Sequence, residues 1–301
     1  MQWLLQHWPL LDTTPKQSAS SSSSCTPARS HQITTHTIST AIEAQLGRCS
    51  QLAHPHFLKC ERERTSQPRL LGRACADKLR AMTLALVTGA NRGIGLELTK
   101  QLLDRGVDVI AAVRSSSAEL SATKAEIVTG VEVVSDDAAS KLLAAVGDRT
   151  LDILINNAGI GRGSSIKELN VAGVREQFEV NALAPLRLSI ALSSCMKQGG
   201  KIGLVTSRMG SIADNTSGGA YGYRMSKAAL NAAGKSLAVD LAPHGISVAL
   251  LHPGWVKTDM TGGTGNITAA ESASQLIARM DAMNLENSGT FFHANGEVLP
   301  F

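Results

Sequence analysis

Short apolar runs alternate with longer segments of helical periodicity from residue 84 to the end of the chain. Runs such as Leu-Ala-Leu-Val, which begins at Leu84, and Asp-Ile-Leu-Ile, which begins at Asp152, are apolar on both faces. This pattern is typical of parallel strands that helices cover on each side. The predicted strands are Leu84–Thr88, Asp108–Val113, Gly130–Val134, Leu151–Asn156, Lys201–Ser207, Ser247–His252 and Thr290–Phe292. The predicted helices are Ile94–Arg105, Ala138–Val146, Val171–Met196, Tyr223–Leu241 and Thr268–Met283.

This alternation predicts an α/β fold with a single Rossmann-type, doubly wound parallel sheet of about seven strands and helices on both faces. The chain has 301 residues, and length alone allows one large domain or two small ones. Because the alternation is continuous, we expect one domain over residues 82–301, long enough to enclose a large core.

Residues 1–81 show no steady helical or strand periodicity, and residues 18–24 are almost pure serine. Such a composition cannot easily bury enough apolar surface to fold, so we predict a disordered leader. Because the leader is rich in Ser, Thr and Arg and poor in acids, it fits an organelle transit peptide, which would place the protein in chloroplasts or mitochondria. Two alternatives stay open. In the first, the leader is a tail without a targeting role. In the second, translation starts at Met82 and the protein is cytoplasmic.

Charge is unevenly distributed between the leader and the domain. Residues 1–82 carry 10 Lys and Arg against 5 Asp and Glu, whereas residues 83–301 carry 19 against 20. The domain therefore lacks the basic excess typical of nucleic-acid binding. No apolar run approaches the ~20 residues of a membrane span. Of the five cysteines only Cys195 lies in the domain, and no spacing resembles a zinc site, so we expect a reduced protein with no metal, no nucleic acid and no membrane partner.

A glycine-rich turn links the first predicted strand to the first predicted helix. Its sequence is Thr88-Gly89-Ala90-Asn91-Arg92-Gly93-Ile94-Gly95. Without a Cβ, the glycines let the pyrophosphate of a dinucleotide approach backbone N–H groups at the helix start, where the helix dipole favours an anion. Glycine also serves ordinary turns, but three glycines between a strand and a helix are much stronger evidence. The turn therefore predicts a dinucleotide site, whose residues are Gly89, Asn91, Arg92, Gly93, Ile94 and Gly95.

The end of the second predicted strand indicates which dinucleotide binds. In NAD enzymes, an Asp or Glu about 20 residues beyond the last glycine accepts hydrogen bonds from the ribose hydroxyls. Here that region holds Val113 and Arg114, and Arg114 can pair with a 2′-phosphate in a forked geometry. Arg92 can approach the same phosphate. Together the two arginines favour NADP (NADPH) over NAD; the alternative is that each is a solvated surface charge.

A tyrosine and a lysine stand four residues apart in Tyr223-Arg224-Met225-Ser226-Lys227. On a helix these positions share one face, so Lys227 lies beside Tyr223. An unperturbed tyrosine has a pKa of about 10, which a neighbouring ammonium and a bound nicotinamide cofactor would lower. Tyr223 would then donate a proton to a carbonyl oxygen or remove one from an alcohol. Tyr221, the only other tyrosine, has Met225 in place of a lysine, so we prefer Tyr223.

The TGxxxGxG spacing of the glycine turn resembles the short-chain dehydrogenase/reductase family. The sequence Asn156-Asn157-Ala158-Gly159 after the fourth predicted strand matches the family's NNAG signature, and residues 223–227 match its YxxxK. Residues 215–219 and the sequence HPGWVKTDM at 252–260 are most similar to the C-factor/sniffer-like carbonyl reductases. The resemblance covers nearly all of residues 83–301. It implies that Asn157, Ala158 and Gly159 border the cofactor and that Lys227 holds the nicotinamide ribose.

Two further catalytic candidates come from the same resemblance. A hydroxyl must polarise the substrate oxygen, and Ser207, at the carboxyl end of the fifth predicted strand, is favoured over Ser211. Asn181 resembles the family's fourth catalytic residue, which bends a helix and holds a water that relays protons from the lysine. The alternative for Asn181 is a packing or capping role.

The segment after the sixth predicted strand resembles the family's lid over the nicotinamide. The glycines at 262–265 suit a short flexible lid. Trp255 and Met260 either flank an apolar substrate or serve packing. The residues implied to border the nicotinamide are Pro253, Gly254, Val256 and Thr258.

At one position the chain departs from the family. Members often carry an acid after the third strand, in a sequence like Asp-Val-Thr-Asp, that contacts adenine. The aligned stretch here is taken as Val133-Val134-Ser135-Asp136, so Val133 replaces the acid. Adenine would then be held by Val134 and backbone groups.

The set of Asn181, Ser207, Tyr223 and Lys227 favours an NADP-dependent oxidoreductase. It would reduce the carbonyl group of an aldehyde, ketone or quinone to an alcohol, or run the reverse reaction, with hydride from the cofactor. The alternative is an NADP-binding signalling or regulatory protein of the C-factor type with little turnover, although a pure binder has no need of Tyr223. We expect a small carbonyl or alcohol substrate as partner. By resemblance, the predicted helices Val171–Met196 and Tyr223–Leu241 form the face of a homodimer or homotetramer.

Overall fold

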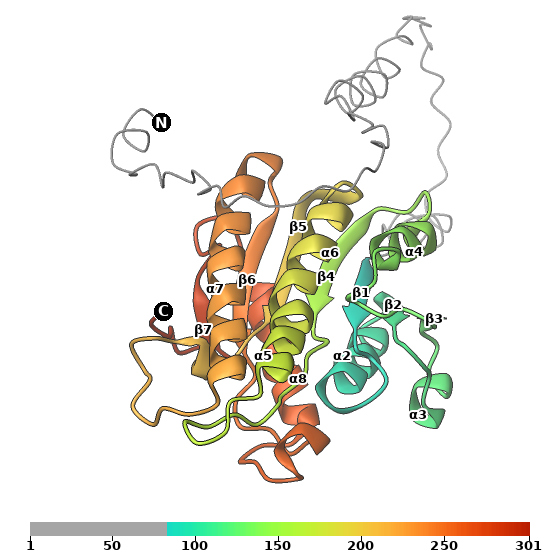
Figure 1. Cartoon of the computed structure of the whole chain (residues 1–301). Coiled ribbons are helices and arrows are strands. Elements are labelled where there is room, and N and C mark those ends of the chain that lie inside the picture. The colour runs from blue at the N-terminus through green and yellow to red at the C-terminus, as the bar shows by residue number, and fades with distance from the viewer. Residues whose placement is uncertain (1–82) are drawn as a thin grey trace, which may run out of the picture. The chain divides into compact units, whose positions relative to one another are not determined.

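The seven apolar runs form seven parallel strands in one sheet, with the order β3-β2-β1-β4-β5-β6-β7 (Figure 1). The computed structural model describes residues 83–301, so the predictions for the leader and for Met82 lie outside the described residues. The doubly wound sheet predicted from the sequence is confirmed. The strands are β1 (Leu84–Thr88), β2 (Asp108–Ala112), β3 (Glu126–Val128), β4 (Leu151–Asn156), β5 (Met196–Val205), β6 (Ser247–His252) and β7 (Phe291–His293).

Helices cover both faces of the sheet (Figure 1). On one face α2 (Gly93–Asp104) packs against α8 (Ala269–Ala282), and α3 (Ala118–Ser121) adds one turn. The other face carries α4 (Ala138–Val146), α6 (Ala184–Ser193) and α7 (Tyr221–Leu241), while α5 (Val171–Phe178) packs against α7. Successive residues of a strand point to opposite faces of the sheet: Leu86 packs against the α4–α6–α7 layer, and Val87 packs against the α2–α8 layer. Both faces of each central strand are therefore apolar because both are covered.

The prediction for the third strand was wrong. The strand is Glu126–Val128, which pairs with β2 in a register that sets Ile110 beside Glu126. Gly130 has a φ of +69° and turns the chain out of the strand. Val131 and Val133 then pack into the α4–α6–α7 core without joining the sheet ladder. Val131 and Val133 are apolar because they pack into the core, so the segment has the alternating pattern of a strand although it does not pair with one.

The predicted long helix Val171–Met196 was also wrong in part. It is divided into α5, a π-helical turn (Glu179–Leu183) and α6, and Met196 already belongs to β5. Asn181 lies in the π turn, so the predicted local distortion of the helix at this residue is confirmed. Strand β5 ends at Val205, which places Ser207 just beyond the strand. Strand β5 also begins at Met196, five residues before the predicted Lys201. The remaining predicted elements agree with the structure to within two residues at either end.

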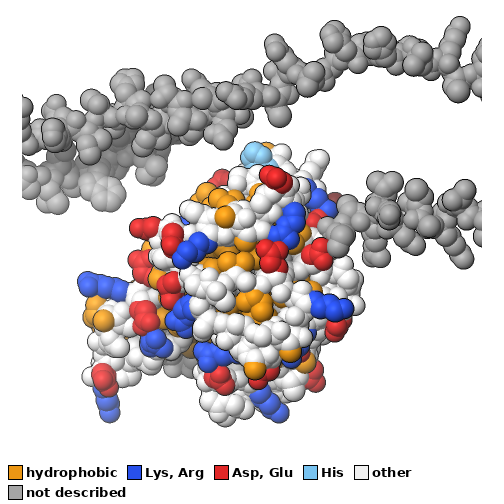
Figure 2. All heavy atoms as spheres, turned by 90° about the vertical axis from the view of Figure 1, so that its right-hand side faces the viewer, with side chains coloured by type: hydrophobic (Ala, Val, Ile, Leu, Met, Phe, Trp, Pro, Cys, Tyr) orange, Lys and Arg blue, Asp and Glu red, His pale blue; other side chains and the backbone are white. Residues whose placement is uncertain are grey.

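The surface of the described domain carries both signs of charge. On the face around the β3 edge of the sheet, acidic and basic side chains are interspersed (Figure 2). Among the helices of residues 83–301, none combines the length and the apolar character that crossing a bilayer demands. Within the same residues, no group of His, Cys, Asp or Glu side chains is arranged to hold a metal ion.

Candidate active site

The glycine turn, the NNAG segment and the predicted lid follow the carboxyl ends of β1, β4 and β6, which lie at one edge of the parallel sheet (Figure 1). Helix α7 begins at the same edge, so Tyr223 lies in its first turn. Ligands of open parallel sheets bind at this edge. The topology thus brings together the candidates that the sequence places up to 170 residues apart.

The glycine turn is held by contacts that allow no side chain at two of its positions. Gly89 has a φ of +66°, in the left-handed region that glycine adopts without strain. A Cβ on Gly95 would lie 2.2 Å from the carbonyl oxygen of Gly89 and 2.5 Å from Nδ2 of Asn157. Glycine at 95 therefore lets α2 start directly against the end of β4. A Cβ on Gly93 would meet only the Thr258 side chain, in van der Waals contact at 3.5 Å, so the glycine turn lies close to the lid at this position.

The NNAG segment ties neighbouring elements together through its two side-chain amides. The Asn157 Nδ2 donates to the carbonyl oxygens of Thr88 (3.0 Å) and Gly89 (3.2 Å). The Thr88 hydroxyl accepts from the backbone N–H groups of Asn157 (3.0 Å) and Ala158 (3.1 Å). Asn156 instead donates to Ser189 Oγ at 3.0 Å, which joins β4 to α6.

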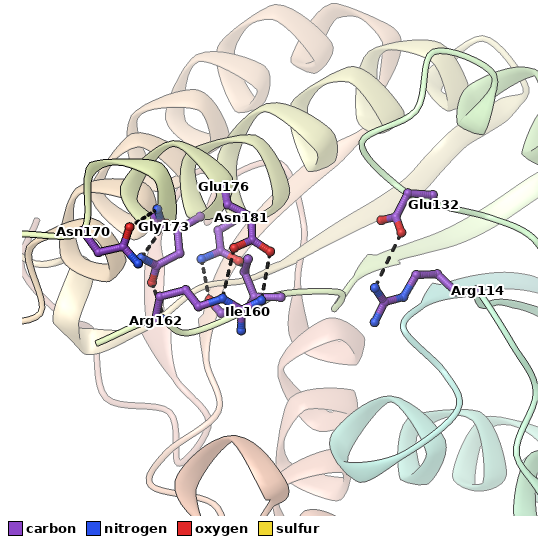
Figure 3. A network of polar contacts seen from close by, with 9 residues as sticks. Arg114, Glu132, Ile160, Arg162, Asn170, Gly173, Glu176 and Asn181 are labelled. Carbon is purple, nitrogen blue, oxygen red and sulfur yellow. Dashed lines mark hydrogen bonds and ion pairs between the residues drawn. The ribbon is translucent and has the colours of Figure 1, made fainter. Parts of the chain in front are cut away.

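Both arginines expected at the cofactor phosphate have a carboxylate partner. Arg92 Nη1 lies 2.9 Å from Asp259 of the lid, and Arg114 Nη1 lies 3.6 Å from Glu132 (Figure 3). All four side chains are exposed, so each pair stabilises the fold by about 0–1 kcal/mol. The ion pairs leave both guanidinium groups accessible from solvent.

Glu132 is a residue that the sequence analysis missed. We had expected Val133 to stand in place of an acid after the third strand; Glu132, one residue earlier, carries a carboxylate that faces Arg114. Val133 turns to the other side, where it lines a narrow crevice with Thr88, Asn156 and Ala158. The alternation Val131-Glu132-Val133 could have indicated this arrangement. In such a pattern the two valines point to one side of the chain and Glu132 points to the other.

Lys227 is buried, and its Nζ donates to the carbonyl oxygen of Val205 at 2.9 Å. Burial lowers the pKa of Lys227 to about 8. The ammonium lies 5.8 Å from the centroid of the Tyr223 ring. A Cβ on Gly159 would lie 3.2 Å from Oδ1 of Asn181 and 3.7 Å from Nζ, so a side chain at this position would crowd the ammonium. An ammonium has three donors, so it can donate to a ligand as well as to Val205.

Ser207 is the polar side chain that acts on the pKa of the Tyr223 phenol. Burial raises the pKa of Tyr223 above its ordinary value, while Ser207 acts in the opposite direction. We had expected a neighbouring ammonium and a bound nicotinamide cofactor to lower this pKa. The net effect of the protein's own groups is instead to raise it. The phenol is therefore protonated near neutral pH until a further positive charge approaches it.

Ser207 and Ser211, the two candidate hydroxyls, have different surroundings. Ser207 caps a short 3₁₀ turn by accepting from the N–H of Met209 at 3.2 Å, and it also reaches the Tyr223 phenol. Ser211 accepts from the N–H of Asp214 at 3.0 Å. The phenol contact favours Ser207, as expected from the sequence.

Asn181 is fully buried at the centre of a hydrogen-bond network. Its Oδ1 accepts from the N–H of Ile160 at 2.8 Å, and its Nδ2 donates to the carbonyl oxygen of Ile160 at 2.9 Å and to Ser226 Oγ at 3.0 Å (Figure 3). The side chain thus joins the π turn, the segment after β4 and helix α7. The proton-relay role of Asn181 stays a prediction.

The predicted lid begins with a sharp change of direction. Gly254 has a φ of +88°, and Val256 forms an isolated parallel bridge with Ile267. Thr258 and Thr261 cap the 3₁₀ turn Asp259–Thr261 reciprocally. Met260, within this turn, is half-exposed. The lid residues predicted at the nicotinamide therefore lie on a loop attached at its base and bound to the glycine turn through Arg92.

Comparisons with known proteins agree with these observations. A family model described as short chain dehydrogenase matches residues 83–267. A 1-hydroxy-2-glutathionyl-2-methyl-3-butene dehydrogenase of Rhodococcus sp. (strain AD45) is 41% identical over 224 residues, which are 72% of this chain and 99% of that protein. The C-signal of Myxococcus xanthus is 46% identical over 154 residues, 50% of this chain and 93% of that protein. Among solved structures, the NADPH-bound carbonyl reductase from chicken fatty liver has a TM-score of 0.67 and 31% identity, and the match covers 73% of this chain and 99% of that one. These similarities confirm the resemblance drawn from the motifs.

Proposed function

Because the chain belongs to the short-chain dehydrogenase family, we propose that it is an NADP-dependent oxidoreductase that reduces the carbonyl group of an aldehyde, ketone or quinone to an alcohol. One observation carries the proposal. The Tyr223 phenol lies near the Ser207 hydroxyl, which acts to lower its pKa, and the buried ammonium of Lys227 lies 5.8 Å from the centroid of the Tyr223 ring. A protein that only binds a dinucleotide has no use for this arrangement.

The residues at the carboxyl edge fit a nicotinamide dinucleotide. The glycine turn offers backbone N–H groups at the start of α2, where an anionic pyrophosphate is favoured. A Cβ on Gly93 would contact the Thr258 side chain at 3.5 Å, and one on Gly159 would lie 3.2 Å from Oδ1 of Asn181 and 3.7 Å from Nζ of Lys227. Side chains at these two positions would therefore narrow the edge where we propose that the cofactor lies. The proposed cofactor contacts are Gly89, Asn91, Arg92, Gly93, Ile94, Gly95, Arg114, Asn157, Ala158, Gly159, Tyr223, Lys227, Pro253, Gly254, Val256 and Thr258.

NADP is proposed over NAD because of Arg92 and Arg114. Both guanidinium groups are exposed and can pair with a 2′-phosphate. The chicken carbonyl reductase, whose crystal structure holds NADPH, is a structural neighbour of this chain.

The chain's own groups perform the proton chemistry. The Tyr223 phenol, which burial keeps protonated, donates its proton to the carbonyl oxygen. Ser207 donates a hydrogen bond to the same oxygen and stabilises its developing negative charge. Lys227, charged below its pKa of about 8, favours the phenolate that remains. Asn181 fixes the segment after β4 against α7. NADPH, when bound, supplies the hydride.

A signalling role of the C-factor type is the alternative, and the similarity to the C-signal of Myxococcus xanthus is its support. The phenol–hydroxyl–ammonium arrangement favours turnover instead. Measurement of NADPH oxidation with aldehydes, ketones and quinones separates the two, because only the oxidoreductase consumes NADPH.

The test compares Tyr223→Phe with Tyr221→Phe. Removing the phenolic hydroxyl of Tyr223 should reduce turnover by about 10²–10⁴-fold, whereas Tyr221 is partly exposed and its variant should keep wild-type turnover. Equal rates of NADPH oxidation by wild type and Tyr223→Phe would show that the catalytic assignment is wrong.

A further inference from the structure

Gln177 is a fully buried amide in α5 that belongs to none of the motifs. Its Nε2 donates to the carbonyl oxygen of Gly173 at 2.9 Å, and its Oε1 accepts from the backbone N–H of Arg162 at 2.9 Å. The guanidinium of Arg162 also contacts both carboxylate oxygens of Glu176, at 3.0 and 2.9 Å (Figure 3). Because a buried amide is costly unless it is hydrogen-bonded, these bonds fix the side chain and hold the segment after β4 against α5.

The same amide packs against the first turn of α7. A Cβ on Gly222 would lie 2.5 Å from Nε2 of Gln177 and 3.1 Å from Cα of Val174, which also lies on α5. The absence of a side chain at residue 222 therefore lets the two helices approach this closely. Since Gly222 directly precedes Tyr223, the Gln177 side chain lies against the backbone that carries the phenol.

The start of α7 depends on such contacts because it lacks a side-chain cap. Its N-cap residue, Ala220, has a φ of +46° and makes no capping hydrogen bond through its side chain. The segment after β4 binds this end instead. Ala220 donates its N–H to the carbonyl oxygen of Ser164 at 3.0 Å, and Gly222 donates to Ser164 Oγ at 3.4 Å. Helix ends without caps fray, so contacts from outside the helix decide where the first turn lies, and Tyr223 with it.

Asn181, four residues beyond this glutamine, makes an equivalent connection. It bonds to both backbone groups of Ile160, in the same segment after β4, and to Ser226 Oγ (Figure 3). Ser226 directly precedes Lys227, as residue 222 precedes Tyr223. Two buried amides on neighbouring helical turns therefore link the segment after β4 to the two functional positions of α7.

We infer that Gln177 is a positioning residue for Tyr223. Its amide holds the first turn of α7 at a fixed place beside the segment after β4, and so fixes the direction of the phenol relative to Ser207 and Lys227. Gln177 acts through Tyr223 and takes no part in proton transfer itself. This role rests on the proposed carbonyl reduction, in which the phenol donates the proton.

The experiment uses Gln177→Met, which keeps the length of the side chain but removes the amide. Misplacing a catalytic group by about 1 Å costs about 10²-fold in rate, so kcat should fall by about 10–100-fold. The rate is NADPH oxidation with menadione or benzaldehyde, whichever the wild type reduces faster. Gln177 contacts none of the proposed cofactor residues except through the start of α7, so the Kd for NADPH should stay within about twofold of wild type.

A double-mutant cycle distinguishes positioning from general support of the fold. The phenolic hydroxyl is already absent in Tyr223→Phe, so adding Gln177→Met should lower the residual rate by less than about twofold. A residue that only supports the fold would lower the rate by the same factor in both backgrounds.

Ser189→Ala is the matched control for loss of a buried hydrogen bond. Ser189 is also fully buried, and it accepts from Asn156 Nδ2 at 3.0 Å in the contact between α6 and β4. The variant should be less stable but should keep kcat within about twofold of wild type. Gly222→Ala disturbs the Gln177 contact from the side of α7. It should lower kcat by about tenfold or more, and it tests the same role if Gln177→Met does not fold.

Gln177 does not position Tyr223 if Gln177→Met or Gly222→Ala keeps kcat within about threefold of wild type. The same conclusion follows if Gln177→Met lowers the residual rate of Tyr223→Phe as much as that of wild type, or if Ser189→Ala loses as much kcat. A different result overturns the proposed function itself. Wild-type protein that binds NADPH in a fluorescence titration but oxidises it with no carbonyl compound is not a reductase.

Discussion

The proposed catalytic end of the site and its proposed phosphate-binding end differ in their contact with water. Asn181 is fully buried and Lys227 is only 4% exposed, whereas the side chains of Arg92 and Arg114 are 69% and 71% exposed. Proton transfer depends on pKa values and orientations that the protein must set, and burial with a few hydrogen bonds sets them. Recognition of a phosphate needs only charge within reach, which solvated side chains can supply. We therefore expect changes at the buried end to have large effects and changes at the exposed end to have small ones.

The largest effect is expected for Lys227→Met. This variant removes the ammonium that favours the phenolate, and we expect kcat to fall by about 10²–10³-fold. Steady-state NADPH oxidation measures the loss. A kcat within tenfold of wild type would show that the buried ammonium does not assist Tyr223.

The same variant should be more stable than wild type at pH 7. Burial lowers the pKa of Lys227 from 10.5 to about 8, so between these pH values the unfolded chain holds more protons than the folded protein. Lys227 therefore lowers the free energy of unfolding most below pH 8. This destabilisation diminishes as the pH rises from about 8 to 10.5. Removing the charge should stabilise the fold at pH 7 by at most about 3 kcal/mol. Urea unfolding at pH 7 and pH 9 should show an advantage of Lys227→Met that narrows at the higher pH; an advantage that grows with pH would contradict this account.

A smaller effect is expected for Arg114→Asp. The new carboxylate would repel a 2′-phosphate and would stand beside Glu132, so the Kd for NADPH should rise by about 10–100-fold while the Kd for NADH changes little. Fluorescence titration of both cofactors measures the ratio. Arg149→Asp is the control, because Arg149 is also an exposed, ion-paired arginine but precedes β4 at the opposite edge of the sheet. An unchanged ratio in Arg114→Asp would overturn the NADP assignment.

The smallest effect is expected for Asp259→Asn. Asp259 competes with a 2′-phosphate for Arg92, and the exposed pair contributes at most about 1 kcal/mol. Releasing Arg92 should tighten NADPH binding by about two- to fivefold and leave NADH binding unchanged. Asp281→Asn, which breaks the similarly exposed Arg105–Asp281 pair far from the glycine turn, should change neither. Weaker NADPH binding in Asp259→Asn would show that the lid acid assists cofactor recognition.

The features predicted correctly from the sequence depend on local geometry. The glycine turn requires a strand and a helix on either side of it, and the spacing of Tyr223 and Lys227 requires one helical turn, so neighbouring residues suffice to identify both. The prediction of the third strand failed because a strand is defined by its pairing with β2 and not by its apolar character. Glu126–Val128 pairs with β2, whereas the buried segment after it does not. Glu132 was missed for the same reason, because its role depends on where that segment turns.

The contacts that hold the segment after β4 in place could not have been predicted from the sequence. Gln177 and Arg162, which fix the segment, belong to no motif, and their contacts exist only once α5 packs beside it. The spacing of apolar residues predicts where helices lie along the sequence, but it does not predict the course of the loops that pack against those helices.

The contrast between the two ends can be tested directly by the ionic-strength dependence of the wild-type enzyme. Salt screens exposed charges much more than buried ones. With a carbonyl substrate at saturation, raising the salt concentration tenfold should raise KM for NADPH severalfold, because Arg92 and Arg114 are solvated. It should leave kcat at saturating NADPH nearly constant, because Lys227 is buried and Tyr223 is half-buried. A kcat that falls steeply with salt while KM for NADPH stays constant would contradict the account.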